Sequence, residues 1–200
     1  YIALDQWARI GTAPPASRYP KVAERGLVPR ARLNDTGLIS FNTPANMLAA
    51  FRLDNGETAP GIATVAPPKW GKPYLTLVPQ VDDDGNELSG IRMPALAVPL
   101  ATYTGWNLRA PELGAPREML QLVGGMRPFA RTREERMPGD ARPPITERYA
   151  SRADYQERVA AEAYSLVKQR LLLAQDVEYV LRNAEALWNA VMAEGAKLGR

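Results

Sequence analysis

Apolar residues recur at helical spacing in two stretches of the last third of the chain. Steps of three and four residues place them on one side of a helix, which is the pattern of an amphipathic helix. The pattern therefore predicts two helices. The apolar residues are Tyr155, Val159, Ala163, Leu166 and Val167 in the first stretch, which ends near residues 171–173, and Val177, Val180, Leu181, Ala184, Leu187, Trp188 and Val191 in the second.

Both predicted helices begin at residues that favour helix N-termini. Ser151 is suited to the N-cap of the first, and Asp154 adds a negative charge where the helix dipole favours it. Asp176 can cap the second helix, and Gly195 can end it. A connection of a few residues makes the two helices antiparallel neighbours, so we expect a helical hairpin within residues 141–200. Its joint apolar face either packs onto the rest of the chain or binds a partner, and core packing is the favoured use.

The start of the chain predicts one further helix. Apolar residues follow helical spacing over residues 1–10, and Gly11 is a suitable C-cap. Prolines begin directly afterwards, and the last of the 18 prolines is Pro144. Because proline disfavours helical geometry at its own position and at the preceding one, we expect residues 12–140 to be a Pro-rich region of strands and loops.

Two short features are recognisable within this region. Residues 74–78 are rich in apolar, β-branched and aromatic side chains and predict a strand. An Asp-Gly turn follows at residues 82–86, so we expect residues 88–93 to return antiparallel as a hairpin. The acids of this turn also suggest a calcium loop, but aligning its glycine with the invariant glycine of such a loop puts Gln80 and Ile91 at ligand positions. A solvated turn is the preferred interpretation.

The composition is that of an ordinary globular protein. Hydrophobic residues make up 46% and charged residues 24% of 200 residues, which is enough for one domain with a core. No apolar run approaches the ~20 residues that span a bilayer, so we expect no membrane span. The net charge of +3 is interspersed with acids, and residues 117–152 carry eight arginines beside five acids. This pattern indicates solvated surfaces and no nucleic-acid partner, because nucleic-acid binding needs a clustered basic face.

Residues for the common hydrolytic and metal chemistries are missing. The sequence has no histidine and no cysteine, which excludes a Ser-His-Asp triad, a thiolate nucleophile and the commonest metal ligands within this chain. None of its five serines lies in a Gly-x-Ser-x-Gly turn, and the glycine pair at 124–125 lacks the phosphate-binding pattern. A carboxylate pair is a weaker option, because Asp54, Glu57, Glu134 and Glu135 lie in polar segments. We therefore expect no catalytic residue, no metal and no cofactor here.

Residues 102–109 hold the densest group of aromatic and directional polar side chains. Flat apolar area combined with a few fixed hydrogen-bonding groups is typical of a pocket wall. The alternative is a tight turn in which the tryptophan fills a core position and the arginine caps backbone carbonyls. The two interpretations stay open on the sequence alone. The substrate-pocket candidates are Tyr103, Thr104, Trp106, Asn107 and Arg109, arranged around Gly105.

Four groups of segments carry family-like motifs. They are residues 4–7 with 11–20, residues 83–94 running on into 97–109, residues 128–136, and residues 147–155. Together they resemble the C-terminal region of a bacterial family of "alpha/beta hydrolase domain" proteins. The motifs cover most of the chain, residues 21–70 match little, and none of the motifs is a catalytic signature.

In that family the nucleophilic serine and the histidine precede the region that is similar to this chain. The resemblance therefore implies an α/β fold of the α/β-hydrolase type for the whole protein, with this chain as a mixed α+β C-terminal portion. Residues 1–11 would close the hydrolase sheet, residues 12–140 would form the strand and loop region, and residues 141–200 the helical hairpin. All three would be parts of one larger domain, whose upstream catalytic portion is the expected partner.

The activity that the resemblance implies is hydrolysis of a carboxylic ester. The substrate would be a small-molecule ester or acyl compound, and this chain would complete the fold and shape the substrate entrance. No catalytic residue is carried over onto any position of the chain. The alternative is a binding or structural module without catalysis. A Gly-x-Ser-x-Gly motif and a histidine upstream in the same reading frame would distinguish the two.

Overall fold

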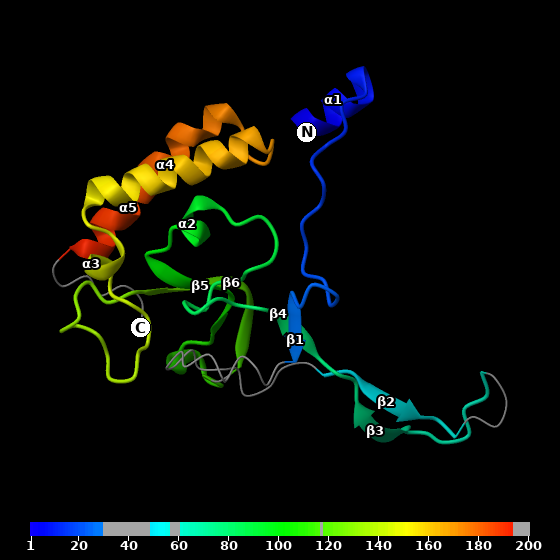
Figure 1. Ribbon diagram of the computed structural model, residues 1–200. Coiled ribbons are helices and arrows are strands. Elements are labelled where there is room, and N and C mark those ends of the chain that lie inside the picture. Colours follow the sequence, from blue (N-terminus) through cyan, green and yellow to red (C-terminus); the bar gives the residue numbers. More distant parts are fainter. Residues whose placement is uncertain (30–48, 57–60, 117, 194–200) are drawn as a thin grey trace.

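The helical hairpin lies over one side of the molecule, and a long β-arm projects from the opposite side (Figure 1). The computed structural model describes residues 1–29, 49–56, 61–116 and 118–193. Within these residues the chain is mixed α and β, and its strands form three separate two-stranded antiparallel ribbons. The mixed α+β character expected for this portion is confirmed, whereas the described strands form only small sheets.

The predicted hairpin is confirmed. Helix α4 (Arg152–Lys168) and helix α5 (Val177–Met192) run side by side, joined through the short 3₁₀ helix η3 (Ala174–Asp176). The Ser151 hydroxyl accepts a hydrogen bond from the Asp154 backbone N–H at 3.1 Å, which is the expected N-cap.

Asp176 occupies the N-cap position of α5, as predicted, but it does not cap the helix through its side chain. Its side chain makes no capping hydrogen bond, because the preceding 3₁₀ turn holds its backbone in helical geometry (φ −90°, ψ −7°) rather than the extended geometry of an N-cap. Helix α5 ends at Met192, and Gly195, the expected end, lies outside the described residues.

The apolar faces of both helices pack into the core. In α4 the predicted residues Tyr155, Val159, Ala163 and Leu166 are buried, and in α5 Val177, Trp188 and Val191 are buried. The rings of Tyr155 and Trp188 are stacked with centroids 5.1 Å apart, and Tyr149 meets Tyr155 edge-on at 5.2 Å. Offset and edge-on ring pairs of this kind add to the stabilisation from burial. Core packing, and not partner binding, is therefore the use of these positions. The remaining core residues from other elements include Val98, Leu100, Phe129 and Ile145.

The core is completed by the longest ribbon, which lies beneath the helices. Strand β5 (Ala101–Leu108) pairs antiparallel with β6 (Met119–Pro128), from Ala101 opposite Pro128 to Leu108 opposite Met119. The end at Ala101 is buried and the other end is more exposed. The short helices α2 (Pro94–Ala97) and α3 (Ile145–Arg148) flank the buried end, and η2 (Pro111–Leu113) lies in the β5–β6 connection.

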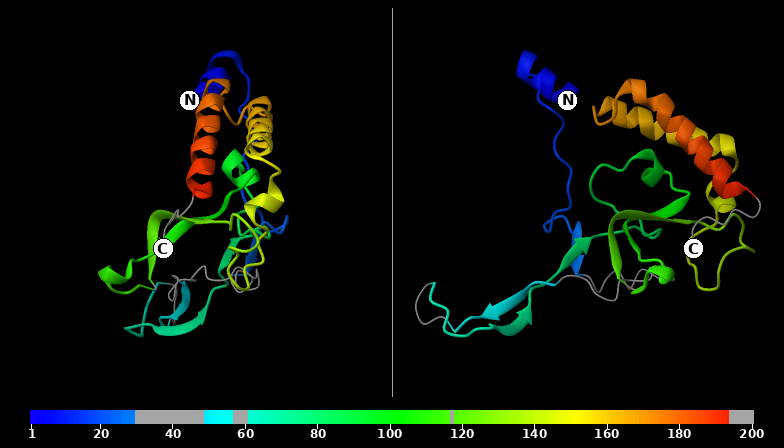
Figure 2. Two further views of the ribbon diagram at one scale, coloured as in Figure 1. Left: turned by 90° about the vertical axis from the view of Figure 1, so that its left-hand side faces the viewer. Right: turned by 180° about the vertical axis from the view of Figure 1, so that it is seen from behind.

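Two further ribbons extend away from this core. Strand β1 (Leu27–Pro29) pairs with β4 (Leu77–Pro79), and β2 (Phe51–Asp54) pairs with β3 (Lys69–Pro73). The β2–β3 ribbon is the projecting arm, and it stands clear of the helices in every view (Figure 2).

The strand expected over residues 74–78 is wrong in its extent. Only Leu77 and Val78 belong to β4, whereas residues 74–76 cross from one ribbon to the next, and the Tyr74 N–H donates to the Ala50 carbonyl beside β2 at 2.8 Å. Local β-propensity was outweighed here, because a strand exists only where another strand supplies its hydrogen bonds.

The expected return strand is also wrong. Residues 88–93 form no strand; a single antiparallel bridge joins Val81 to Glu87, and the Leu88 N–H donates to the Gln80 carbonyl at 3.0 Å. The chain then turns at Gly90, which has a positive φ of 90°, and enters α2. A left-handed backbone at this point ends the pairing of the two segments.

The first helix is confirmed as α1 (Ile2–Ile10), with Gly11 as a left-handed C-cap. None of its residues is buried, and Leu4, Trp7 and Ile10 are each more than half exposed. It is held to the hairpin by polar contacts, in which the Arg170 guanidinium donates to Gln6 Oε1 and to the Ala13 carbonyl, both at 2.8 Å. The described part of the chain therefore leaves the apolar side of α1 exposed.

Candidate functional site

The pocket candidates from the sequence lie on and directly after one strand. Tyr103, Thr104, Trp106 and Asn107 belong to β5, and Arg109 follows its last residue. The segment is therefore half of a long ribbon and not a tight turn. Tyr103, Thr104, Trp106 and Arg109 are half-buried, and Asn107 is exposed.

The ribbon is interrupted in the middle of this group. Thr104 lies opposite Gly125 and Trp106 lies opposite Gln121, so Gly105 alone faces residues 122–124 of β6. This is a β-bulge, which bends a ribbon and re-aims its side chains. The Thr104 hydroxyl stabilises the bulge by donating to the Trp106 carbonyl at 2.6 Å.

Glycines in β6 make this close approach possible. A Cβ atom on Gly125 would lie 2.7 Å from Thr104 Oγ1, and one on Gly124 would lie 3.1 Å from the Thr104 carbonyl oxygen. Glycine within a strand pattern often marks a bulge or a close backbone approach. The pair at 124–125 was thus the signal that could have located the bulge from the sequence.

Two further candidates, Arg109 and Asn107, also bind neighbouring backbone. Arg109 Nε donates to the Gly114 carbonyl at 3.2 Å and Arg109 Nη2 to the Leu113 carbonyl at 3.1 Å. The Asn107 side-chain oxygen accepts from the Leu108 N–H at 2.8 Å. In this respect Arg109 behaves as the alternative interpretation expected, by capping carbonyls. Trp106, by contrast, is half-buried and is not among the core residues.

Tyr103 carries a polar atom without a partner. Its hydroxyl oxygen is buried and has no hydrogen-bond partner among the described residues, and burial raises its pKa to about 12. Its backbone N–H donates to the Asn86 side-chain oxygen at 2.8 Å, and Asn86 Nδ2 donates to the Ala101 carbonyl at 3.1 Å. Since a buried hydroxyl without a partner is unfavourable, Tyr103 is suited to receive a polar group.

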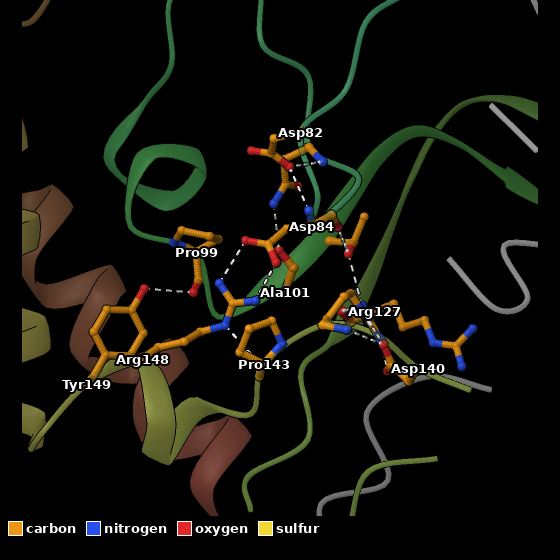
Figure 3. Close-up of polar contacts among 12 residues, drawn as sticks. Asp82, Asp84, Pro99, Ala101, Arg127, Asp140, Pro143, Arg148 and Tyr149 are labelled. Atoms are coloured by element: carbon orange, nitrogen blue, oxygen red, sulfur yellow. Dashed lines mark hydrogen bonds and ion pairs between the residues drawn. The ribbon is translucent and has the colours of Figure 1, made fainter. Parts of the chain in front are cut away.

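A buried polar network supports the other side of β5 (Figure 3). Thr102 Oγ1 donates to the Asp84 carbonyl and accepts from Arg142 Nη1 at 2.9 Å. Arg142 is also paired with Asp140, with nitrogen–oxygen distances of 2.6 and 2.8 Å, and these hydrogen bonds lower the pKa of Asp140. The sequence did not predict this network, because most of its partners lie far apart along the chain and no local spacing pattern links them.

The Asp-Gly turn belongs to the same network. Asp84 is paired with Arg148 through both carboxylate oxygens, and Asp82 accepts from Arg92 Nη2 at 2.7 Å. Asn86 is fully buried, and only Asp83 among the three aspartates is exposed. The prediction of a solvated turn is therefore wrong: arginines and a buried asparagine hold the turn against the core.

The two adjacent glutamates considered from the sequence, Glu134 and Glu135, have lowered pKa values. A general acid needs a raised pKa, whereas hydrogen bonds lower the pKa of Glu134, from Thr132, and of Glu135, from Arg131. Asp54 is exposed, and Glu57 lies outside the described residues.

No three acidic side chains converge on a possible metal site within the part of the chain that the structure describes. Among the helices described, none is long and apolar enough to cross a membrane.

The comparisons with known proteins agree with the motifs along the chain. The profile of a family described as "alpha/beta hydrolase domain" matches residues 1–182. The chain therefore belongs to the alpha/beta hydrolase domain family. Neither the curated proteins nor the solved structures give a match to this sequence.

Proposed function

We propose that this chain is the C-terminal portion of an α/β-hydrolase-like enzyme that cleaves carboxylic esters. The observation that carries the proposal is that the chain belongs to this hydrolase family but contains no histidine among its 200 residues. Serine hydrolases need a base to activate the nucleophile, and neither that base nor a nucleophile turn occurs in this sequence. The proposal therefore places the serine and the histidine upstream, in the same polypeptide.

The exposed face of α1 supports this arrangement. An amphipathic helix is stabilised chiefly by burying its apolar side, yet Leu4, Trp7 and Ile10 are exposed here. In the proposal, residues 1–11 close the sheet of the catalytic portion and cover these side chains. Residues 12–140 and the helical hairpin of residues 141–200 complete the same domain.

The role proposed for the β5–β6 ribbon is to shape the substrate entrance. The bulge at Gly105 re-aims Trp106 relative to a regular strand, and the buried hydroxyl of Tyr103 has no hydrogen-bond partner among the described residues. An apolar wall with a few directional polar groups is suited to a small ester or acyl compound. Thr104, Asn107 and Arg109 keep the ribbon in this shape through their hydrogen bonds.

The test is to express the complete reading frame that contains this chain and to assay it with p-nitrophenyl esters and a fluorophosphonate probe. The expected result is ester turnover, with the probe attached to a serine upstream of Tyr1. A complete protein that holds an intact upstream Ser and His, but neither turns over esters nor reacts with the probe, would contradict the proposal. That result would favour a binding or structural module without catalysis.

A further inference from the structure

Leu122 is the most exposed leucine that the structure describes. Its side chain is fully exposed, and its backbone has a φ of 62°, in the left-handed region. That region is unfavourable for a residue with a branched side chain, and water is unfavourable for leucine. Neither the exposed side chain nor the left-handed backbone stabilises this chain. We therefore expect Leu122 to have a functional role.

The geometry at Leu122 is imposed by the ribbon around it. Leu122 is one of the three residues that face Gly105, at the bulge that the Thr104–Trp106 hydrogen bond stabilises. β6 has two more residues than β5 at this point, and a Cβ atom on Gly124 or Gly125 would crowd Thr104. Strained residues at bulges often serve a site, because the bulge directs a side chain that a regular strand would not.

Leu122 has partly exposed apolar neighbours on its own strand. Leu120 and Val123 are also partly exposed on β6, and Trp106 lies opposite Gln121 on β5. The only charged residue of β6 is Arg127, near the other end of the strand. Such a strip is suited to an uncharged hydrocarbon group.

We propose that Leu122 is a specificity-determining residue that contacts the hydrocarbon part of the ester substrate. The inference rests on the proposed function, and it names the substrate class as esters with a medium or long acyl chain. Leu122 takes no part in bond making or breaking. In this proposal Leu122 forms the apolar outer edge of the substrate entrance, and Trp106 forms part of its wall.

The experiment uses the complete protein and the variant Leu122→Gly. Glycine accepts a φ of 62° without strain and removes the whole apolar side chain. The matched control is Ala115→Gly, since Ala115 is also exposed and has a positive φ of 49°, but carries no large apolar group. The readouts are kcat/KM for p-nitrophenyl acetate, butyrate and octanoate, together with the melting temperature.

The expected result for Leu122→Gly is a fall of about tenfold in the octanoate-to-acetate ratio of kcat/KM, with a melting temperature no lower than that of Ala115→Gly. The control should keep the wild-type ratio. An unchanged ratio in Leu122→Gly overturns the inference and leaves the proposed function standing. A melting temperature several degrees below the control, whatever the ratio, means that Leu122 packs against the upstream portion, and it also overturns the inference. If the complete protein hydrolyses no ester, the proposed function and this inference fail together.

Discussion

At the scale of single residues, arginine–carboxylate pairs join parts of the chain that are far apart in sequence. Arg148 links helix α3 to Asp84 in the turn before β5, and its guanidinium lies 4.0 Å from the ring centroid of Phe129. Arg142 and Asp140 are both almost fully buried, and Arg142 also donates a hydrogen bond to Thr102. Such pairs are sensitive to loss of one partner, because the remaining charge is then buried without compensation.

We predict that Asp140→Asn destabilises the protein by about 3–5 kcal/mol, because it leaves the Arg142 guanidinium buried and unpaired. The measurement is urea unfolding near neutral pH. The control is Glu178→Gln, which removes an exposed pair with Arg182 and should change the stability by less than about 0.5 kcal/mol. Equal effects of the two changes would show that the Arg142–Asp140 pair contributes no more than a surface pair.

The same pair should make stability depend on acid. The hydrogen bonds from Arg142 lower the pKa of Asp140 in the folded state, so its contribution is present in full above the pKa of the unfolded chain. That contribution is lost as the pH falls through the folded pKa. Melting temperatures between about pH 7 and pH 2.5 should therefore converge for the wild type and Asp140→Asn at the acid end. A constant difference across that range would contradict this assignment.

A further residue-scale prediction concerns Trp106 in the complete protein. If its half-buried ring is part of the entrance wall, Trp106→Ala should raise KM severalfold or change the substrate preference, with little change in melting temperature. A ring that fills a core position would instead cost about 3–5 kcal/mol on truncation. Kinetics and thermal unfolding of the same preparation separate the two. A large loss of stability with unchanged kinetics of the folded fraction would exclude Trp106 from the site.

At the scale of elements, the helical hairpin is the best-packed part of the chain. Leu166 in α4 is buried, and Leu187 in α5 is half-buried against the aromatic core. The hairpin is tied to the N-terminal segment at its loop, where Gln169 and Arg170 meet Arg18, Gln6 and Ala13. Its contribution to stability therefore comes mainly from its apolar face.

We predict that Leu166→Asp destabilises the fold by several kcal/mol, and that Leu187→Asp does so to a smaller extent. The reason is that each change places a charge in an apolar environment, more completely for Leu166 than for Leu187. Tyr164→Asp, on the exposed side of α4, is the matched control and should have little effect. Thermal unfolding followed by circular dichroism measures all three. An unchanged melting curve for Leu166→Asp would mean that this face is not part of the core.

At the scale of the whole molecule, two apolar surfaces besides the strip around Leu122 stand out among the described residues. One is the outer side of α1, and the other is the arm, where Phe51 and Trp70 meet edge-on at 4.9 Å and Trp70 is 74% exposed. Isolated two-stranded ribbons are marginally stable in water, so an arm of this kind needs support from another surface. Both surfaces support the proposal that a catalytic portion of the same protein packs against this chain.

We predict that the isolated 200-residue chain has no esterase activity. The reason is the absence of histidine, cysteine and a nucleophile turn, since a serine hydroxyl without a base is a poor nucleophile at neutral pH. The purified chain should leave p-nitrophenyl acetate at its rate in buffer alone. Saturable turnover that disappears when a single serine is replaced would contradict this prediction.

The sequence by itself determined the three long helices, the family and the missing chemistry. Helix periodicity and caps such as Ser151 depend on residues a few positions apart, so their signal is local. The pairing of β1 with β4 and the buried Arg142–Asp140–Thr102 cluster involve partners distant in the chain, which no local pattern records. The exposure of Leu122 likewise depends on the register of β6 against β5. Only the tertiary structure decided these features, because strand partners and buried ion pairs form where the fold brings separate segments together.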